Sequence, residues 1–302
     1  MATDDKPVKI TQVAVGVLQK PDGSVLYAQR PAGKVYEGWW EFPGGKREHG
    51  EPIEQTLVRE LQEELGITVT QFAPWVIRDH VYPHASVRLH FFRVTQWLGD
   101  PASREGQVLR WQDPAIAAPQ PLLPAAIPVI DWLSLPRRYV YTGANLLGIG
   151  EAANAVKNQI KKGACLVQLF EPSLSDHDVI ALYKRLSSEL EGATNSRLVM
   201  HQVHQHVLTK SIDQTDIRMH LDSTSLMACL SRPAAELVGA DCETLDHQAH
   251  ATALGLDFIV MPEDFFLQAA RTSHLPVFVL RKPATGPLPD FLSIGAHGVC
   301  IR

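Results

Sequence analysis

One segment limits most strongly what this chain can fold into: a glutamate-rich run that starts at a proline and stops at a glycine. Pro52 and Gly66 bracket the run, and proline in the first turn with glycine just after the last turn is the usual pattern at helix ends. Leucines recur every four residues between them, at Leu57, Leu61 and Leu65. One side of the run can therefore pack into a core. The sequence predicts an amphipathic helix over Pro52–Leu65.

The same helix carries three carboxylates on one face. Glu60, Glu63 and Glu64 stand at positions i, i+3 and i+4, so their side chains project together. Like charges at this spacing repel by a few tenths of a kcal/mol per exposed pair. A divalent cation would remove the repulsion, and oxygen ligands suit Mg²⁺ or Mn²⁺, which bind nucleotide phosphates. The alternative is a solvated face joined by ion pairs, such as Arg59 with Glu63.

Residues beside the helix fit a metal and phosphate site. Arg59 could orient a glutamate or neutralise phosphate charge through its planar guanidinium. Glu51 precedes the helix, where a carboxylate is electrostatically favoured. Gly44 and Gly45 would let the backbone approach the metal closely and offer a carbonyl oxygen as a further ligand.

The stretch from Gly45 to Ile67 reads GKREHGEPIEQTLVRELQEELGI. It matches the signature of the Nudix hydrolases at every fixed position, and the preceding Trp40–Lys46 segment, WEFPGGK, resembles the MutT subgroup of that family. The resemblance covers about residues 8–133. It implies an α+β Nudix fold, in which a mixed β-sheet lies between helices.

The resemblance also implies a set of site residues. The metal, Mg²⁺ or Mn²⁺, would be held by Gly44, Glu60, Glu63, Glu64 and Glu105. Catalytic roles fall to Glu60, Glu63, Arg59 and Glu105, and the identity of the general base among the glutamates stays open. Substrate binding is expected at Arg30, Glu41, Phe42, Gly45 and Ala126, with Arg30 on the phosphates.

The implied activity is hydrolysis of a nucleoside triphosphate to a nucleoside monophosphate and pyrophosphate. Metal ions would offset the charge on the phosphoryl group while a carboxylate takes a proton from water. MutT enzymes that clear oxidised guanine nucleotides in DNA repair read the base partly with an asparagine, and Ala126 stands at that position. Alanine supplies no paired donor and acceptor. The resemblance therefore implies a nucleotide substrate that is either 8-oxo-dGTP or another (d)NTP.

The remainder of the first domain is rich in predicted strands. Thr11–Leu18 and Ser24–Ala28 flank a Pro-Asp-Gly turn and are expected to form a hairpin. Further strands are expected near Trp75–Tyr82 and Val87–Trp97, and a short helix closes at Trp132. The first domain is expected to span residues 1–133.

After a linker around Leu133–Arg137, strands and helices alternate, which is typical of a parallel (β/α)₈ barrel. The candidate strands are Tyr139–Thr142, Cys165–Phe170, Leu198–Gln202, Ile217–Leu221, Glu236–Ala240, Asp257–Val260, Val277–Leu280 and Gly298–Ile301. Only about 165 residues are available where such a barrel typically takes about 250. The second domain, residues 138–302, is therefore expected to be a compact or degenerate TIM-type barrel with some short helices.

This second domain resembles the TenI and thiamin-phosphate-synthase barrels. The matching segments are Tyr139–Thr142, Leu166–Leu169, Met219–Leu221, Val238–Cys242 and Gly295–Val299. Phe170 and Pro172 stand where the synthases have an arginine and a lysine, and Arg281-Lys282-Pro283 replaces a Gly-Gly turn that binds phosphate. Proline removes a backbone donor there. The resemblance therefore implies a barrel without synthase activity, which supports, regulates or oligomerises the enzyme.

Composition and charge limit the classes of molecule that this chain is expected to bind. The chain has 28 Lys and Arg against 33 Asp and Glu, a net charge of −5, and no basic block for nucleic acid or an anionic membrane. It contains no run of about 18 apolar residues and starts with a charged segment, so the expected location is the cytoplasm. The four cysteines form no CxxC pair and are expected to be free thiols. The scattered histidines match no closed zinc site, and the oligomeric state stays open.

Two further functions remain open. The chain could be a thiamin-pathway enzyme whose Nudix half cleaves a thiamin-type pyrophosphate. It could also be a sensor of nucleotides or thiamin phosphates that binds without turnover, although a pure binder has no need of the complete set of Glu60, Glu63 and Glu64.

Overall fold

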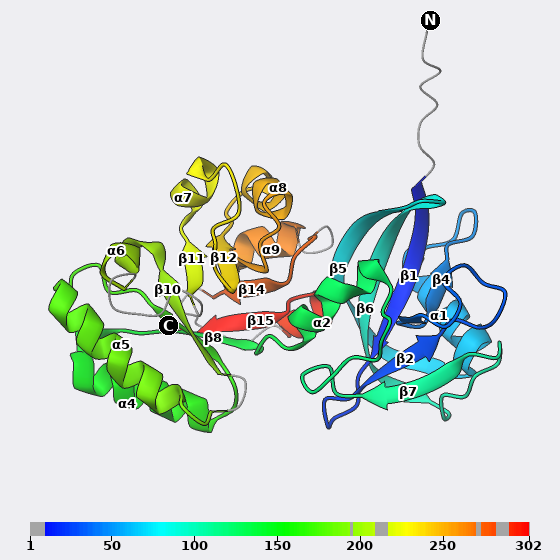
Figure 1. Cartoon of the computed structure of the whole chain (residues 1–302), viewed down its shortest axis with the longest axis horizontal. Coiled ribbons are helices and arrows are strands. Elements are labelled where there is room, and N and C mark those ends of the chain that lie inside the picture. The colour runs from blue at the N-terminus through cyan, green and yellow to red at the C-terminus, as the bar shows by residue number, and fades with distance from the viewer. Residues whose placement is uncertain (1–9, 194–195, 209–216, 270–272, 282–289, 302) are drawn as a thin grey trace, which may run out of the picture. The chain divides into compact units, whose positions relative to one another are not determined.

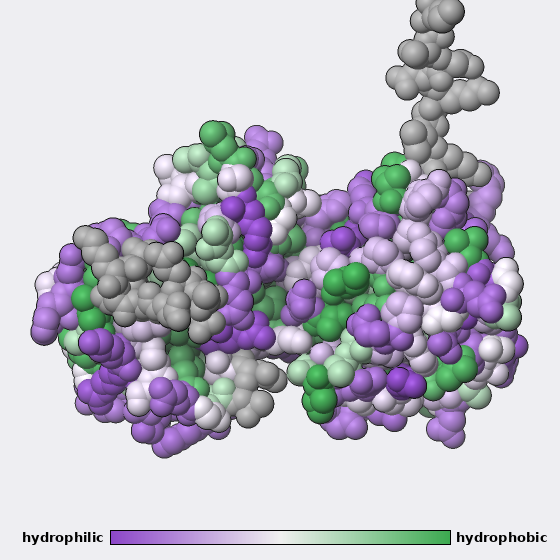
Figure 2. All heavy atoms as spheres, in the orientation of Figure 1, coloured by the Kyte–Doolittle hydropathy of each residue, from purple (hydrophilic) through white to green (hydrophobic). Residues whose placement is uncertain are grey.

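The computed structural model describes residues 10–193, 196–208, 217–269, 273–281 and 290–301 (Figure 1). The chain divides into two compact units, Met1–Ser134 and Leu135–Arg302. On the face displayed in Figure 2, hydrophilic residues predominate and small hydrophobic groups lie between them. Among the described residues, no helix has the length and apolar character needed to span a bilayer.

The first unit contains two β-sheets. The first is mixed and has the order β4-β1-β6-β5, with β1 and β6 parallel and the other neighbours antiparallel. The second is antiparallel and has the order β3-β2-β7. The strands are β1 (Ile10–Leu18), β2 (Val25–Gln29), β3 (Trp40–Glu41), β4 (Gly44–Lys46), β5 (Thr68–Tyr82), β6 (Ala85–Leu98) and β7 (Val108–Gln112). This is the expected α+β fold, with its strands divided between two sheets.

The predicted hairpin of the first two strands is wrong. Both edges of β1 are occupied, by β4 on one side and β6 on the other, while β2 pairs with β3 and β7. Only an isolated bridge between Gln19 and Val25 joins the two chain segments. The turn at Pro21-Asp22-Gly23 therefore carries the chain from one sheet to the other, because each strand finds a partner distant in sequence.

The predicted helix is confirmed as α1 (Ile53–Leu65). Pro52 occupies its N-cap, and Gly66 ends it in the left-handed conformation at φ 71°, which glycine adopts without a Cβ penalty. Three of its leucines are fully buried in a cluster with Ala14 of β1 and Phe92 of β6. Burying one such leucine contributes roughly 1.5–3 kcal/mol. The unit ends with the 3₁₀ turn η1 (Pro124–Ala126) and α2 (Ile127–Leu133).

The second unit is a closed barrel of eight parallel strands, as predicted, in the order β10-β11-β12-β13-β14-β15-β8-β9. The strands are β8 (Arg138–Tyr141), β9 (Leu166–Leu169), β10 (Arg197–His201), β11 (Arg218–Leu221), β12 (Leu237–Asp241), β13 (Phe258–Pro262), β14 (Val277–Leu280) and β15 (Gly298–Ile301). Closure satisfies the backbone hydrogen bonds of every strand and leaves no free sheet edge.

The helices of this unit vary in length, as expected for a compact barrel. They are α3 (Ala144–Leu147), α4 (Ile149–Lys161), α5 (Asp176–Leu190), α6 (Gln205–Leu208), α7 (Ser223–Ala228), α8 (Leu245–Ala253) and α9 (Glu263–Ala269), with 3₁₀ turns η2 (Gln202–His204) and η5 (Phe291–Ile294). Figure 1 shows α4 and α5 side by side. Tyr139, Phe258 and Phe278 are buried with ring centroids 5.3–5.6 Å apart. No disulfide joins the cysteines in the described part of the chain.

Candidate active site

The glutamate face of α1 is built around Arg59. Its Nη1 donates to Glu60 Oε1 at 3.0 Å and to Glu63 Oε2 at 2.9 Å. Its Nε and Nη2 donate to the two oxygens of Glu51 at 3.0 and 3.1 Å, and Nη2 also reaches the carbonyl oxygen of Lys46 at 3.1 Å. The ion-paired arrangement that the sequence left as an alternative is therefore present. Among the described residues, no group of three or more His, Cys, Asp or Glu side chains is gathered to hold a metal.

Glu64 has a different environment from the other two glutamates. Its Oε2 accepts a hydrogen bond from Gly44 N at 3.0 Å, and it has no ion pair among the described residues. Burial raises the pKa of Glu64 to about 8, and repulsion from Glu41, Glu60 and Glu105 adds to the shift. The desolvated carboxylate is thus disfavoured until a positive charge arrives. An all-oxygen donor set short of positive charge fits a hard divalent cation.

Gly44 and Gly45, the first two residues of β4, bring the backbone of that strand close to the carboxylates of α1. A Cβ on Gly45 would lie 2.1 Å from the carboxyl carbon of Glu60, so only a residue without a side chain leaves that carboxylate in place. Gly44 has φ +145°, and a Cβ there would lie 2.1 Å from the carbonyl oxygen of Ala14. These contacts explain why the chain needs glycine twice beside the helix.

A second ion pair lies at the end of β2. Arg30 Nη1 donates to both oxygens of Glu41 at 2.7 and 2.8 Å, and its Nε donates to the carbonyl oxygen of Val35 at 2.7 Å. Burial raises the pKa of Glu41, while Arg30 opposes the shift. Because Glu41 also repels Glu64, this pair adjoins the glutamate face of α1. The structure therefore brings Arg30 and Glu41 to the same region as the helix.

The remaining predicted site residues form two groups: Glu105 lies near the glutamates of α1, whereas Phe42 and Ala126 are buried. Glu105 is exposed on the loop after β6, close enough to Glu60 and Glu64 to raise the pKa of both carboxyl groups. Phe42 is only 3% exposed and packs against Tyr27 and Phe91. Ala126, in η1, is 5% exposed. Little of the side chain of Phe42 or Ala126 is therefore available to a substrate.

Comparison with known proteins agrees with this geometry. A family model described as "NUDIX domain" matches residues 14–131. The 8-oxo-dGTP diphosphatase of Proteus vulgaris is 43% identical over 98 residues, which are 32% of this chain and 88% of that protein. The chain belongs to the Nudix family.

Other relatives of the Nudix unit differ in the nucleotide that their names specify. The CTP pyrophosphohydrolase of Escherichia coli K12 is 38% identical over 130 residues, covering 41% of this chain and 91% of that protein. A MutT structure, from a study of Aliivibrio salmonicida and Vibrio cholerae, is 36% identical over 41% of this chain and 97% of its own, with a TM-score of 0.37. The Nudix unit is thus a homologue of pyrophosphohydrolases.

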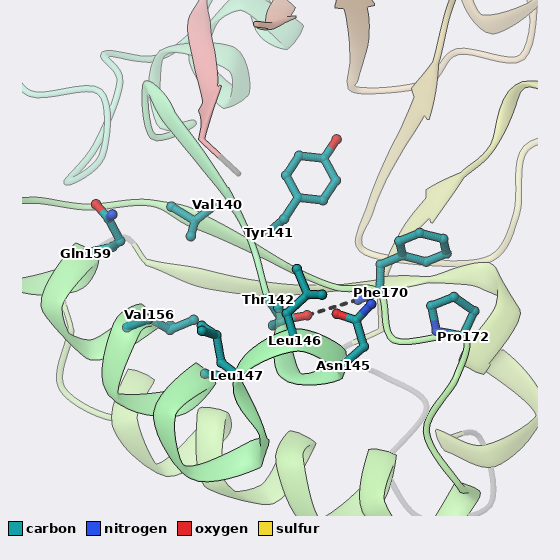
Figure 3. Close-up of a pocket in the computed structure, with 13 residues that line it drawn as sticks. Val140, Tyr141, Thr142, Asn145, Leu146, Leu147, Val156, Gln159, Phe170 and Pro172 are labelled. Atoms are coloured by element: carbon teal, nitrogen blue, oxygen red, sulfur yellow. Dashed lines mark hydrogen bonds between the residues drawn. The ribbon is translucent and has the colours of Figure 1, made fainter. Parts of the chain in front are cut away.

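The barrel unit has its own cavities at the carboxyl ends of its strands. One, of about 560 Å³, is mainly apolar and is lined by Leu147 and Val156 on the helix side and by Phe170 and Pro172 after β9 (Figure 3). Phe170 N donates to Thr142 Oγ1 at 3.4 Å in its wall. A second cavity, of about 640 Å³, shares Phe170 and Pro172 with the first. The two cavities are therefore adjacent.

The second cavity is polar. Asp241, one of its lining residues, lies with Oδ1 3.0 Å from His220 Nε2, and His220 Nδ1 lies 2.9 Å from the buried Tyr139 hydroxyl. Burial lowers the pKa of His201 to about 4. Gln168 is 1% exposed, and its Oε1 has no hydrogen-bond partner among the described residues. Neither cavity has lysine or arginine among its described lining residues.

Lys282 and Pro283 lie outside the described residues. They are two of the three residues that were expected to replace the glycine turn of the synthases. Arg281 directly follows β14 and does not line either cavity.

Proposed function

We propose that the Nudix unit is a Mg²⁺-dependent nucleoside triphosphate pyrophosphohydrolase that releases a nucleoside monophosphate and pyrophosphate. The observation that carries the proposal is Glu64. It accepts a hydrogen bond from Gly44 N at 3.0 Å. Burial and repulsion from Glu41, Glu60 and Glu105 raise its pKa, and no cation forms an ion pair with it among the described residues. Mn²⁺ would satisfy the same oxygen ligands.

The proposed ligands are the carboxylates of Glu60, Glu63, Glu64 and Glu105 and the carbonyl oxygen of Gly44. When bound, the metal would offset charge on the transferring phosphoryl group. Arg59 Nη1 would leave Glu60 and Glu63 to make room, while its Nε and Nη2 keep their bonds of 3.0 and 3.1 Å to Glu51. Arg59 would thus stay beside the phosphates, and Arg30 would contribute a second guanidinium.

The proton of the attacking water goes to a carboxylate in this proposal. Glu60, Glu63 and Glu105 all have the required chemistry. Glu63 is the more exposed of the two glutamates bonded to Arg59, with 55% of its side chain exposed against 15% for Glu60. The geometry therefore favours Glu60 as a fixed ligand and leaves the base to Glu63 or Glu105.

The proposed substrate is a (d)NTP whose base is not read by a side-chain amide at position 126. Ala126 is buried and apolar, and the relatives include one named for 8-oxo-dGTP and one named for CTP. 8-oxo-dGTP therefore remains one candidate within a panel of canonical and oxidised nucleotides, and thiamin diphosphate represents the thiamin-pathway alternative.

The test is pyrophosphate and phosphate release from canonical dNTPs, 8-oxo-dGTP, NDP-sugars and thiamin diphosphate, with Mg²⁺ and with excess chelator. We expect Mg²⁺-dependent pyrophosphate release from at least one (d)NTP. Preference for thiamin diphosphate would support the alternative enzyme, and no release from any compound would support the sensor.

We also propose that the barrel is a TenI-like domain without synthase activity. Phe170 and Pro172 lie in the wall of both cavities, where a phosphate-binding synthase needs cations. Because the described lining contains no lysine or arginine, the barrel lacks the cations that bind phosphate, and its proposed role is to support, regulate or oligomerise the enzyme. Formation of thiamin phosphate from its pyrimidine and thiazole precursors by the whole chain would contradict this proposal.

A further inference from the structure

Aromatic side chains gather at the edge of the Nudix site, from the loop after β2 and from the β5–β6 turn. The ring of Tyr36 lies 5.1 Å from that of Trp39 and 5.5 Å from that of Tyr82. Tyr82 is nearly parallel to His84, with centroids 5.6 Å apart and an interplanar angle of 27°. His84 is exposed, and the other three are half-buried. Tyr82 also lies edge-on to His80, with ring centroids 4.4 Å apart, so the cluster is a group of packed rings that is partly open to solvent.

The conformation of Tyr36 shows that its position is imposed by the loop. Its φ is 60°, and it is the only described non-glycine residue with a positive φ. A bulky residue in this region is a genuine outlier, which persists only when its surroundings hold it. Here Arg30 holds the loop: its Nε bonds Val35 O at 2.7 Å, and its carbonyl oxygen accepts from Gly38 N at 3.0 Å. The strained tyrosine and the proposed phosphate-binding arginine are therefore parts of one structure.

Tyr82 joins the aromatic rings to the site in a second way. Burial raises the pKa of Tyr82, a backbone hydrogen bond with Ala125 opposes this shift, and Glu41 and Arg30 are close enough to contribute to it. Glu41 in turn repels Glu64. Because Arg30 is bonded both to the loop that carries Tyr36 and to Glu41, the order along the unit is the aromatic cluster, then the Arg30–Glu41 pair, then the carboxylates of α1. A nucleotide presents the same order, from its base to its polyphosphate.

We propose that Tyr36 and Tyr82 form a platform on which the base of the nucleotide substrate stacks. The proposal rests on the proposed function, because it takes the polyphosphate to lie at α1. Every base has a π-face, so stacking on aromatic side chains tolerates any sequence of bases. Since buried Ala126 offers no side-chain hydrogen bond to a base, this platform makes the Nudix unit accept several bases, with purines bound more tightly than pyrimidines because their ring area is larger.

The experiment compares a ligand that has a base with one that does not. Binding of nucleoside monophosphates and of ribose 5-phosphate to the full chain is measured by isothermal titration calorimetry in Mg²⁺, for wild type, Tyr36→Ala, Tyr82→Ala and Tyr82→Phe. Val81→Ala is the matched control, because Val81 is 77% exposed next to Tyr82 and contributes no ring. Circular dichroism checks that each variant folds.

We expect each Tyr→Ala change to raise the Kd for nucleoside monophosphates about 10-fold, within the range for loss of one stacking partner, and to leave ribose 5-phosphate binding unchanged. Tyr82→Phe keeps the ring and should stay within about 2-fold of wild type. Equal losses for both ligands, or no loss for either, would overturn the platform. So would a change in oligomeric mass with unaltered nucleotide binding, because a second copy of the chain would then be what covers the rings.

These outcomes are separable from failure of the proposed hydrolase. A wild-type chain that binds nucleoside monophosphates in a Tyr82-dependent manner, yet hydrolyses no triphosphate, would overturn the proposed activity while supporting the platform. A chain that hydrolyses triphosphates with the same KM in the Tyr36→Ala and Tyr82→Ala variants would overturn the platform while supporting the activity.

Discussion

Two adjacent glycines impose different requirements on the protein. Gly45→Ala places a methyl group 2.1 Å from the end of the Glu60 side chain, which can swing away because it is flexible. We expect the free energy of unfolding to change by less than about 1 kcal/mol, within the range of ordinary point substitutions. Turnover should fall at least 10-fold, because a displaced carboxylate no longer sits where the metal is proposed. Urea unfolding and steady-state kinetics on one preparation measure both.

Gly44→Ala is the matched comparison. Its Cβ would lie 2.1 Å from the carbonyl oxygen of Ala14, a backbone atom, and the residue has φ +145°. The fold itself must then shift, so this variant should lose several kcal/mol of stability. If Gly45→Ala destabilised the protein as much as Gly44→Ala, the Glu60 side chain would be unable to move aside for the new methyl group, contrary to our expectation.

Glu64→Gln tests the proposed metal ligand directly. The substitution keeps the volume and the acceptor oxygen for Gly44 N but removes the charge, so the fold should survive and turnover should fall by about 100-fold or more, a loss in the range seen when electrostatic groups of an active site are removed. Glu54→Gln, on the same helix and outside the hydrogen bonds that Arg59 makes among the described residues, is the control. Near-normal turnover of the Glu64 variant in Mg²⁺ would remove the central observation of the proposed function.

At the scale of the element, the start of α1 depends on a charged Glu51. Hydrogen bonds from Arg59 and Thr56 lower the pKa of Glu51 to about 2, below its ordinary value near 4.5. The unfolded chain therefore binds this proton first. The stabilisation is complete above about pH 4.5 and is lost as the pH falls toward 2. Urea unfolding between pH 5.5 and 3 should show a shallower decline in Glu51→Gln than in wild type; equal slopes would contradict this role.

The elements themselves were predictable where the signal is local. The bounds of α1 follow from Pro52 and Gly66, and the barrel strands follow from apolar runs separated by helix-length spacers. Pairing was not predictable for β1 and β2, because the partners β4, β6 and β7 lie far along the chain. The short, partly exposed strand β7 has no alternating apolar pattern strong enough to reveal it.

The candidate site was likewise predictable from the sequence only where the signal is local. Spacing along one helix placed Glu60, Glu63 and Glu64 together, but nothing in that spacing shows that Arg59 occupies two of them. The meeting of Tyr36 with Tyr82 depends on an unusual backbone conformation and on a distant turn. A cluster of Tyr, Trp and His on both sides of the Nudix signature was the one available signal, and aromatic residues alone are more often core than ligand sites.

At the scale of the whole molecule, the two units should respond separately to ligands. Each has its own buried core, and the proposed nucleotide site lies entirely in the first. Mg²⁺ with a nucleoside monophosphate at 100 times its Kd should stabilise that unit by about 2.7 kcal/mol. Differential scanning calorimetry should show one transition moving to higher temperature while the other stays. A single transition that moves as a whole would contradict independent unfolding.

The closed barrel has a consequence for how such a chain can change over generations. Hydrogen bonds between neighbouring strands close the barrel, and the buried rings of Tyr139, Phe258 and Phe278 pack against one another. Side chains just after the strand ends contribute little to the stability of this core. Substitutions at the rim can therefore change which small molecules the cavities accept while the barrel keeps its fold.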